Sequence, residues 1–405
     1  MKSPALVLYE DAAARTLEPF ALTRPTTEFS TGAVLLRERW VALAPTAALT
    51  RVGAPHLAAF DEPGTPRTAQ GTLPAGTLVA NARFAPALAQ QWSDEGQPDA
   101  WTADGRVAAV RLGQPLDAAA LADGTLALES LLPTSAVTAA LTGWWIDHAW
   151  DLVRHLGAML GSDVPAIGAT LAVHAPRTLD DVRVSGSHEV YIEDGAVVEP
   201  FVLLDAQFGP ILVRRGAHIQ AFTRLVGPCA VGADSTVHGG KVANSGIGEG
   251  CRVHGEVNTS LFFGQCNKAH EGFVGHSVLG RWSNLGAGTT TSNLKNSYGP
   301  VQMWSPAGVL DSGMQFLGSL IGDHAKLAIG TQLMTGSLIG AGASVFGAAS
   351  PAKAVPPFSW GGGDRVYALD KFLEVAQHVL QRRGVTMSDA LRQALADAHA
   401  RRWTT

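Results

Sequence analysis

The chain has 405 residues, of which 46% are hydrophobic and 16% charged, and its formal net charge is −5. Its length is sufficient for two or more domains with cores of their own. The acidic balance argues against a nucleic-acid surface, and no apolar stretch reaches the roughly 18 residues of a membrane-spanning helix. Three cysteines without the paired spacing of zinc ligands are typical of a reduced, cytoplasmic protein.

Residues 1–145 alternate short apolar runs with polar connections, a pattern that indicates a small, Rossmann-like α/β domain. The first run, ALVLYE, is interrupted by Glu10 and Asp11, so it predicts a first strand rather than a signal peptide. A short helix is expected at Pro86–Trp92, because proline suits the first position of a helix.

Residues 146–165 are predicted to form a linking helix. The prediction rests on the helical spacing of apolar residues between Trp144 and Leu160. This helix would connect the first domain to the repeat that follows.

Residues 166–358 contain apolar residues that recur every six positions. The clearest two blocks are Val213, Ile219, Leu225, Val231, Val237 and Ile321, Leu327, Leu333, Ile339, Val345. A six-residue period fits short parallel strands joined by tight turns, three to a coil. The pattern therefore predicts a left-handed parallel β-helix. A prism of this kind has a thin core and flat sides, so we expect a homotrimer.

Two segments depart from this period. Residues 294–318 gain bulky residues and are expected to form a loop that protrudes from the prism. Residues 359–405 should contain two amphipathic helices, Arg365–Arg383 and Ser388–Trp403, with Thr386 and Asp389 spaced as in a capping box. These helices are expected to cap the prism.

The segment 270–295 carries the most informative polar residues. His270, Asn284 and Asn293 stand within the six-residue period. A histidine that titrates near neutrality can take a proton from an ammonium group, leaving an amine that attacks a thioester. The alternative is an ordinary solvent-facing histidine of the repeat.

A second alternative is a zinc site built from histidines. Some prisms of this type bind zinc through three histidines, and His254, His270, His276 and His324 are the residues available here. His270 and His276 are one hexad apart and should point from different faces, so we expect no metal in the prism.

The pattern K-x-H-(x)13-N-L-G-A-G-T-(x)3-N, which ends at Asn293, resembles the acetyltransferase domain of a known bifunctional family. Its members join N-acetylglucosamine-1-phosphate uridyltransferase and glucosamine-1-phosphate acetyltransferase activities. The pattern is equally similar to archaeal sugar-1-phosphate nucleotidyltransferases that carry the same prism. Closer still is a variant group found largely in Bacteroidetes, which TRPTTEFSTGAVLLRERW, GEVNTSLFFGQCNKAHEGFVGHSVLG and PPFSWGG resemble. The resemblance covers most of the chain.

The resemblance implies roles for the motif residues. His270 would be the base for attack on acetyl-CoA, Asn284 would contact the amino sugar, and Asn293 the acyl group or coenzyme. Two positions depart from the family: a tyrosine is replaced by Phe273 and a lysine by Asn258. The contacts to the sugar phosphate must therefore differ.

Lysines near the motif are candidates for phosphate contacts, as point charges. We expect Lys268 and Lys241 to bind the sugar phosphate, and Lys295 and Lys326 to bind the coenzyme. His324 is a further candidate in the same prism. The alternative for each lysine is a solvated surface position.

The resemblance also implies nucleotidyl transfer by the N-terminal domain, from a nucleoside triphosphate and with Mg²⁺. The segment LYEDAAARTLEPFALTRP lies where the family has a glycine-rich phosphate loop, but it lacks the glycines. Arg15, Thr23 and Arg24 are the expected phosphate contacts, and Arg83 stands near the place of the metal aspartate.

The sequence thus predicts an acetyl-CoA-dependent N-acetyltransferase acting on an amino-sugar 1-phosphate, with a nucleotidyltransferase-type domain. Two alternatives remain open: a sugar-1-phosphate nucleotidyltransferase whose prism serves only assembly, and a non-catalytic scaffold that binds sugar nucleotides.

Overall fold

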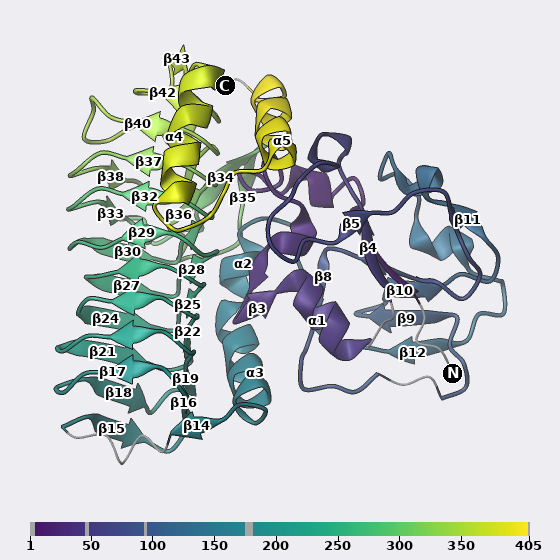
Figure 1. Ribbon diagram of the computed structural model, residues 1–405, viewed down its shortest axis with the longest axis horizontal. Helices are drawn as coiled ribbons and strands as arrows, with labels where there is room; N and C mark the ends of the chain where they lie inside the picture. The colour runs from purple at the N-terminus through teal and green to yellow at the C-terminus, as the bar shows by residue number, and fades with distance from the viewer. Residues whose placement is uncertain (1–4, 45–47, 93–94, 175–180, 404–405) are drawn as a thin grey trace.

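The computed structural model of the chain describes residues 5–44, 48–92, 95–174 and 181–403. An N-terminal α/β domain lies beside a parallel β-prism, and two helices at the C-terminus pack on the upper part of the prism (Figure 1). Within those ranges, no helix is both long and apolar enough to cross a bilayer.

The N-terminal domain is built on a seven-stranded mixed sheet of order β12-β9-β10-β7-β1-β4-β5. β1 (Ala5–Tyr9) pairs in parallel with β4 and β7, whereas β10 runs antiparallel to β7. Helix α1 (Leu36–Leu43) packs on the sheet through Leu36 and Trp40. The predicted α/β domain is therefore confirmed. The remaining strands are β4 (Ala48–Val52), β5 (Arg67–Thr68), β7 (Leu78–Asn81), β9 (Ala100–Ala103), β10 (Arg106–Arg111) and β12 (Thr138–Ala140).

Three two-stranded sheets complete this domain, and one of them corrects two predictions. No helix forms at Pro86–Trp92, because Phe84–Pro86 is a strand (β8) that pairs with β13 (Gly143–Trp145). The pairing also removes Trp144 from the linking helix, which begins only at Asp151. Both strands were missed because their partners lie far apart in the chain. The other two sheets are β2 (Ser30–Thr31) with β3 (Val34–Leu35) and β6 (Thr72–Leu73) with β11 (Leu116–Asp117).

The prism has three faces of parallel strands. The first face contains β14 (Val173–His174), β16 (Val190–Glu193), β19 (Ile211–Val213), β22 (Cys229–Val231), β25 (Gly246–Ile247), β28 (Leu261–Phe262), β31 (Val278–Leu279), β36 (Ser319–Ile321), β39 (Ser337–Ile339) and β41 (Ala354–Val355), with β14 alone antiparallel. The second face contains β17 (Val197–Val198), β20 (His218–Ile219), β23 (Thr236–Val237), β26 (Arg252–Val253), β29 (Asn267–Lys268), β32 (Asn284–Leu285), β37 (Lys326–Leu327), β40 (Ser344–Val345) and β42 (Ser359–Trp360), and ends in antiparallel β43 (Arg365–Val366). The third face contains β15 (Arg183–Gly186), β18 (Leu203–Ala206), β21 (Thr223–Val226), β24 (Gly240–Ala243), β27 (Glu256–Asn258) and β30 (Phe273–Gly275), followed by the pair β33 (Thr290–Thr291) and β38 (Gln332–Leu333).

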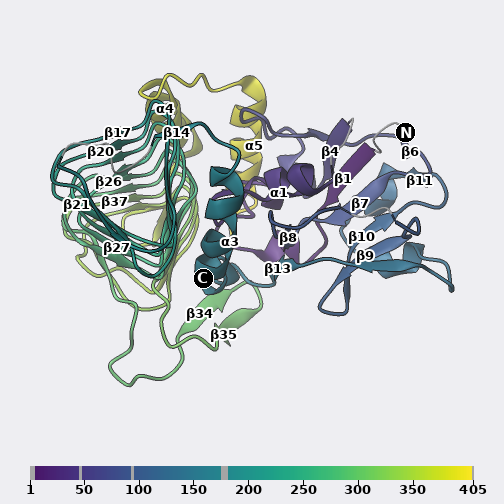
Figure 2. The ribbon, with the colours of Figure 1, turned by 90° about the horizontal axis from the view of Figure 1, so that it is seen from below.

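The six-residue period fills the inside of this prism. Every residue of the two blocks predicted from the sequence is buried in one continuous hydrophobic core. The phase shift after Val237 reflects a shorter coil, since Val237 pairs with Val253 after 16 positions whereas Ile219 pairs with Val237 after 18. Figure 2 looks along the prism, and the coils superimpose in that view. The parallel β-solenoid is confirmed, and its left-handed sense stays a prediction.

Helices α2 (Asp151–Arg154) and α3 (Leu156–Gly168) lie between the two large units (Figure 1). Their apolar residues form one cluster with side chains on the first face of the prism, such as Leu212 and Leu261, and with Phe29 of the N-terminal domain. The linking helices therefore join the two units through shared apolar packing.

Helix α4 (Leu369–Gln381) is shorter than predicted, because Arg365 and Val366 belong to β43. Helix α5 (Asp389–Ala400) is also shorter, since it ends at Ala400 rather than at Trp403. The cap of α5 is Ser388, whose hydroxyl accepts from the Leu391 amide, rather than the predicted box of Thr386 and Asp389. One apolar cluster contains residues of both helices, Phe358 of the prism and Leu57 of the N-terminal domain. The two helices thus clasp both units.

Candidate active site on the prism

His270 stands at the edge where the second face turns into the third, between β29 and β30. Its side chain is exposed, and among the described residues no side chain forms a hydrogen bond with its ring. Lower on the same edge, Phe201 and Phe222 project outward, but nearer His270 the edge positions are Gly255 and Gly272. The edge beside His270 is therefore open to a substrate.

Lys268 does not project toward the site, contrary to the sequence prediction. It pairs with Val253 in an inward position and is 1% exposed. Its Nζ donates to the backbone oxygens of His254 at 3.0 Å and His270 at 2.5 Å. Burial lowers the pKa of this amine to about 8. Lys268 holds the turn that carries His270, so it is a positioning residue rather than a substrate contact.

The third face runs between His270 and Asn293. Asn293 follows β33, and its Nδ2 lies 2.8 Å from Nδ1 of His276. Burial lowers the pKa of the His276 ring to about 4, so this ring stays neutral near pH 7. Lys241 lies two rungs below Phe273 and is 3.4 Å from the exposed Glu256 carboxylate. The structure thus places Asn293 and His270 at opposite edges of one face.

Asn284 lies on the second face, away from Asn293. Its Oδ1 accepts from Nδ2 of Asn267 at 2.6 Å. Lys326 is the next rung and donates to the backbone oxygen of Trp282 at 2.5 Å. Both residues line a pocket of about 500 Å³ beneath helix α4. Asn284 and Lys326 are therefore brought together, on a different face from Phe273.

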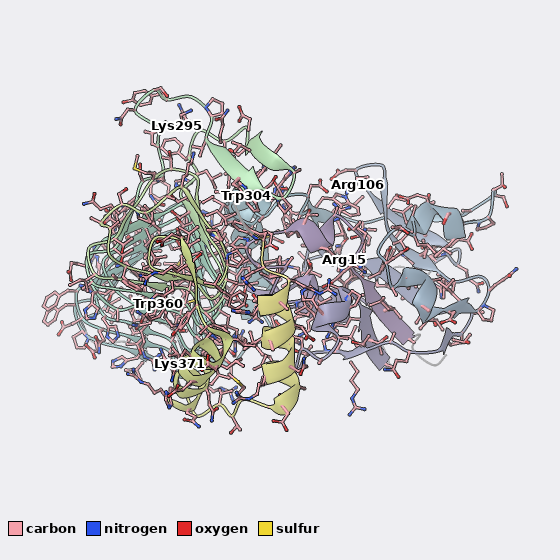
Figure 3. All side chains as sticks on the ribbon, turned by 90° about the horizontal axis from the view of Figure 1, so that it is seen from above. Arg15, Arg106, Lys295, Trp304, Trp360 and Lys371 are labelled. Atoms are coloured by element: carbon pink, nitrogen blue, oxygen red, sulfur yellow. The ribbon has the colours of Figure 1, made fainter. Side chains whose placement is uncertain are left out.

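The segment 294–318 leaves the prism as a loop and a hairpin, β34 (Gln302–Ser305) with β35 (Gly308–Asp311). Lys295 lies on the outer part of the loop, and its Nζ donates to the Pro300 oxygen at 2.9 Å (Figure 3). The hairpin folds back, since Trp304 stacks on Trp403 with ring centroids 3.9 Å apart. The loop protrudes as predicted, but its second half is anchored to the C-terminus.

His324 is buried, and burial lowers the pKa of its ring to about 3, so it faces no substrate. His270 follows β29, whereas His276 follows β30, which places the two rings at different edges. In the described part of the chain no group of three or more His, Cys, Asp or Glu residues is placed to hold a metal ion.

Two of the three phosphate contacts predicted in the N-terminal domain are wrong. Arg24 is 2% exposed and bonds Asp323 of the prism at 2.8 Å and Glu62 at 2.8 Å. Thr23 is 3% exposed, so its side chain is not accessible to a ligand. Arg15 remains accessible, although its guanidinium donates to the Ala122 oxygen at 2.8 Å. The sequence alone did not predict the burial of Arg24, because it pairs with Asp323 of the prism.

A separate pocket of about 490 Å³ lies in this domain where β1 and β7 end. Ligands of α/β sheets bind at the carboxyl ends of parallel strands, so this is the expected place for a nucleotide. The loop after β1 is no phosphate cradle, however, since the Ala14 amide donates to the Asp11 carboxylate and the Ala12 amide to the Gly124 oxygen. Lining residues include Tyr9, Asp11, Asn81, Arg83 and Arg106.

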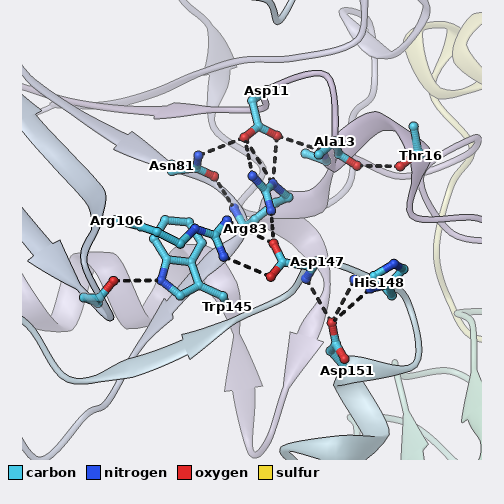
Figure 4. Close-up of polar contacts among 12 residues, drawn as sticks. Asp11, Ala13, Thr16, Asn81, Arg83, Arg106, Trp145, Asp147, His148 and Asp151 are labelled. Carbon is cyan, nitrogen blue, oxygen red and sulfur yellow. Dashed lines mark hydrogen bonds and ion pairs between the residues drawn. The ribbon is translucent and has the colours of Figure 1, made fainter. Parts of the chain in front are cut away.

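Arginines neutralise Asp11 of this pocket and the nearby Asp147 (Figure 4). Arg83 bonds Asp11 at 2.7 Å and also contacts Asp147, which pairs with Arg106 at 2.9 Å. Arg106 lies over the Trp145 ring, 3.7 Å from its centroid. Burial would raise the pKa of the Asp11 carboxyl, but hydrogen bonds from Arg83 hold it below its usual range. Asp11 and Asp147 are already bound to guanidinium groups, so these two carboxylates do not fit Mg²⁺.

The chain is similar to known proteins over part of its length. Residues 6–170 match the sugar nucleotidyl transferase family. A bifunctional sugar-1-phosphate nucleotidylyltransferase/acetyltransferase of Sulfurisphaera tokodaii is 32% identical over 91 residues, which are 22% of this chain and 23% of that protein. The Bifunctional protein GlmU of Methanococcus vannielii is 27% identical over 235 residues, 55% of this chain and 48% of the relative. That of Bartonella quintana is 30% identical over 169 residues, 39% and 32% of the two chains.

Over part of its length the chain is thus similar to a sugar nucleotidyl transferase family and to bifunctional GlmU proteins. It spans less than half the length of the curated relatives it matches. The family match ends at residue 170, so it includes helices α2 and α3 together with the mixed sheet.

Sequence reasoning missed the residues that reach a pocket through tertiary contacts. Arg252 directly precedes the inward-facing Val253 on the second face, so the sequence could have predicted that its side chain points outward. Arg382 and Arg383 follow α4, and no local signal places them against β29 and β32. The Asp11 and Asp147 pairings likewise join segments far apart in the sequence.

Proposed function

We propose that the chain transfers an acetyl group from acetyl-CoA to the amine of an amino-sugar 1-phosphate, with glucosamine 1-phosphate as the first substrate to test. The observation that carries the proposal is His270, an exposed ring on an open edge of the prism, within a motif that resembles that of bifunctional acetyltransferases. Lys268 supports it by fixing the backbone of the same turn.

In this mechanism the His270 ring takes a proton from the substrate ammonium group. The free amine then attacks the thioester carbonyl, its nitrogen loses a second proton to water, and collapse of the tetrahedral intermediate breaks the carbon–sulfur bond. The proton held by His270 passes to the departing thiolate, so the enzyme returns to its starting state. Asn293 would contact the acyl group or coenzyme from the far edge of the third face, where His276 fixes its amide. Phe273 between them offers an apolar wall and no hydroxyl.

The edge that carries His270 also offers a surface for self-association. Phe201 and Phe222, 64% and 78% exposed, stack along the edge that carries His270, with ring centroids 6.0 Å apart. Exposed aromatic rings of this kind mark association surfaces. We propose a homotrimer in which a neighbouring prism packs on the part of this edge that carries Phe201 and Phe222 and leaves His270 accessible. We also propose a cytoplasmic protein, in keeping with its three free, buried cysteines.

The N-terminal domain is proposed to attach a nucleotide to the sugar phosphate, at the pocket where β1 and β7 end. Its family match supports this second activity. The competing proposal, a nucleotidyltransferase whose prism serves only assembly, draws on the same match.

One experiment separates these proposals. The protein is incubated with glucosamine 1-phosphate, acetyl-CoA and UTP, singly and together, and products are identified by mass spectrometry. We expect N-acetylglucosamine 1-phosphate whenever the first two are present. Pyrophosphate release without acetylation would favour the assembly role of the prism, and binding without turnover would favour a scaffold.

A further inference from the structure

The pocket beneath α4 has a floor and a wall from different parts of the chain. Its floor is a ladder of outward-facing residues on neighbouring strands of the second face, in the order Arg252, Asn267, Asn284, Lys326. Its wall is the end of helix α4, which supplies Val379 and the two arginines that follow the helix, Arg382 and Arg383. The volume, about 500 Å³, is in the range of small-molecule sites.

The charge of this pocket is entirely positive. Arg252, Lys326, Arg382 and Arg383 line it, and its lining includes no carboxylate. Arg252 donates only to backbone oxygens, those of Asp234 and Cys251 at 2.9 Å each, and Lys326 to that of Trp282. None of the four cations is in an ion pair within the described ranges.

Crowding four uncompensated cations is unfavourable unless an anion binds between them. The pKa values agree with this crowding: burial lowers the pKa of Lys326 to about 8, and burial with the nearby Arg252 lowers that of Arg383. Guanidinium groups match the geometry of phosphate oxygens, and the Asn267 and Asn284 amides offer further polar contacts on the floor.

We propose that this pocket binds the phosphate groups of a phosphorylated substrate, and that helix α4 completes the site by supplying Arg382 and Arg383. Two sources share this chemistry, the nucleotide portion of the acyl donor and the sugar 1-phosphate. Assigning either source rests on the proposed acetyl transfer, whereas anion binding itself does not. The C-terminal helices would then serve ligand binding as well as clasping.

The test is calorimetric titration of the full chain with adenosine 3′,5′-bisphosphate and, separately, with glucosamine 1-phosphate. We expect one of the two to bind, and its affinity to fall at least about tenfold in the Arg382→Ala/Arg383→Ala double variant. Binding of the bisphosphate alone assigns the donor, and binding of the sugar phosphate alone assigns the acceptor. Lys371→Ala, which removes an exposed cation at the other end of α4, is the matched control and should bind as the wild type does.

His270→Ala separates this inference from the proposed function, since it should abolish acetyl transfer while leaving the titration unchanged. Equal affinity of the double variant and the wild type would overturn the proposal. So would the failure of the wild type to bind either compound.

Discussion

At the scale of single residues, position in the hexad decides what a side chain can do. Lys268 occupies a position whose neighbours along the prism are Val253 and Leu285, both in the core. Counted back in sixes from Leu285, the period reaches Leu279, Phe273 and Asn267, so it does not mark Lys268 as an inward position. The strand pairing sets the inward direction instead, because this coil is short and Val253 lies only 15 positions before Lys268.

The buried charge of Lys268 makes stability depend on pH. Folded Lys268 releases its proton near pH 8, whereas a lysine in the unfolded chain keeps it to about pH 10.4. Between these values the unfolded state binds more protons, so this residue makes stability rise with pH and costs most below pH 8. Lys268→Met removes that dependence. Thermal unfolding is measured at about pH 7, 8.5 and 10. The melting temperature of the wild type should rise relative to that of the variant as pH increases.

A difference in melting temperature that stays constant with pH would contradict the buried ammonium. Lys371→Met serves as the control, because Lys371 is exposed and paired with Glu374. Its difference from the wild type should show no gain of this kind between pH 8 and 10.

At the scale of elements, the six-residue period predicted the coils of the prism, whose strands pair with the next coil along the chain. The coils between Val213 and Val237 follow the hexads, because each strand pairs with the next coil. The pairing of β8 with β13 joins residues about sixty positions apart, and no local sequence pattern predicts it. For the site, the edge position of His270 was predictable, but the arginines after α4 were not, since only the path of the C-terminal helices brings them to the second face.

At the scale of the whole molecule, a buried ion-pair cluster joins the N-terminal domain to the prism. Arg24 bonds Glu62 within its own domain and Asp323 across the junction, and Arg281 of the prism lies 3.1 Å from Glu62. Burial alone would raise the pKa of the Glu62 carboxyl, but Arg24 and Arg281 lower it below its usual range. The Trp282 indole also donates to Glu62 at 3.1 Å. The orientation of the two units thus depends on buried, paired charges.

Arg24→Ala should therefore destabilise the protein by about 3–5 kcal/mol, because it leaves Asp323 buried without its partner. We expect a lower melting temperature in calorimetry, with the N-terminal domain and the prism unfolding in separate transitions. The exposed pair of Lys371 and Glu374 gives the control, since Lys371→Ala should change stability by less than about 1 kcal/mol. A single transition at the wild-type temperature would show that apolar packing alone joins the units.

The central claim is that His270 is the base for acyl transfer, and the rate of acetylation in His270→Ala tests it most directly. The rate is measured with glucosamine 1-phosphate and acetyl-CoA, beside His188→Ala, which removes an exposed histidine lower on the prism. A general base contributes about 100-fold or more, so we predict at least that loss for His270→Ala and none for His188→Ala. Light scattering should show the same oligomer for both. An unchanged rate in His270→Ala would contradict the account.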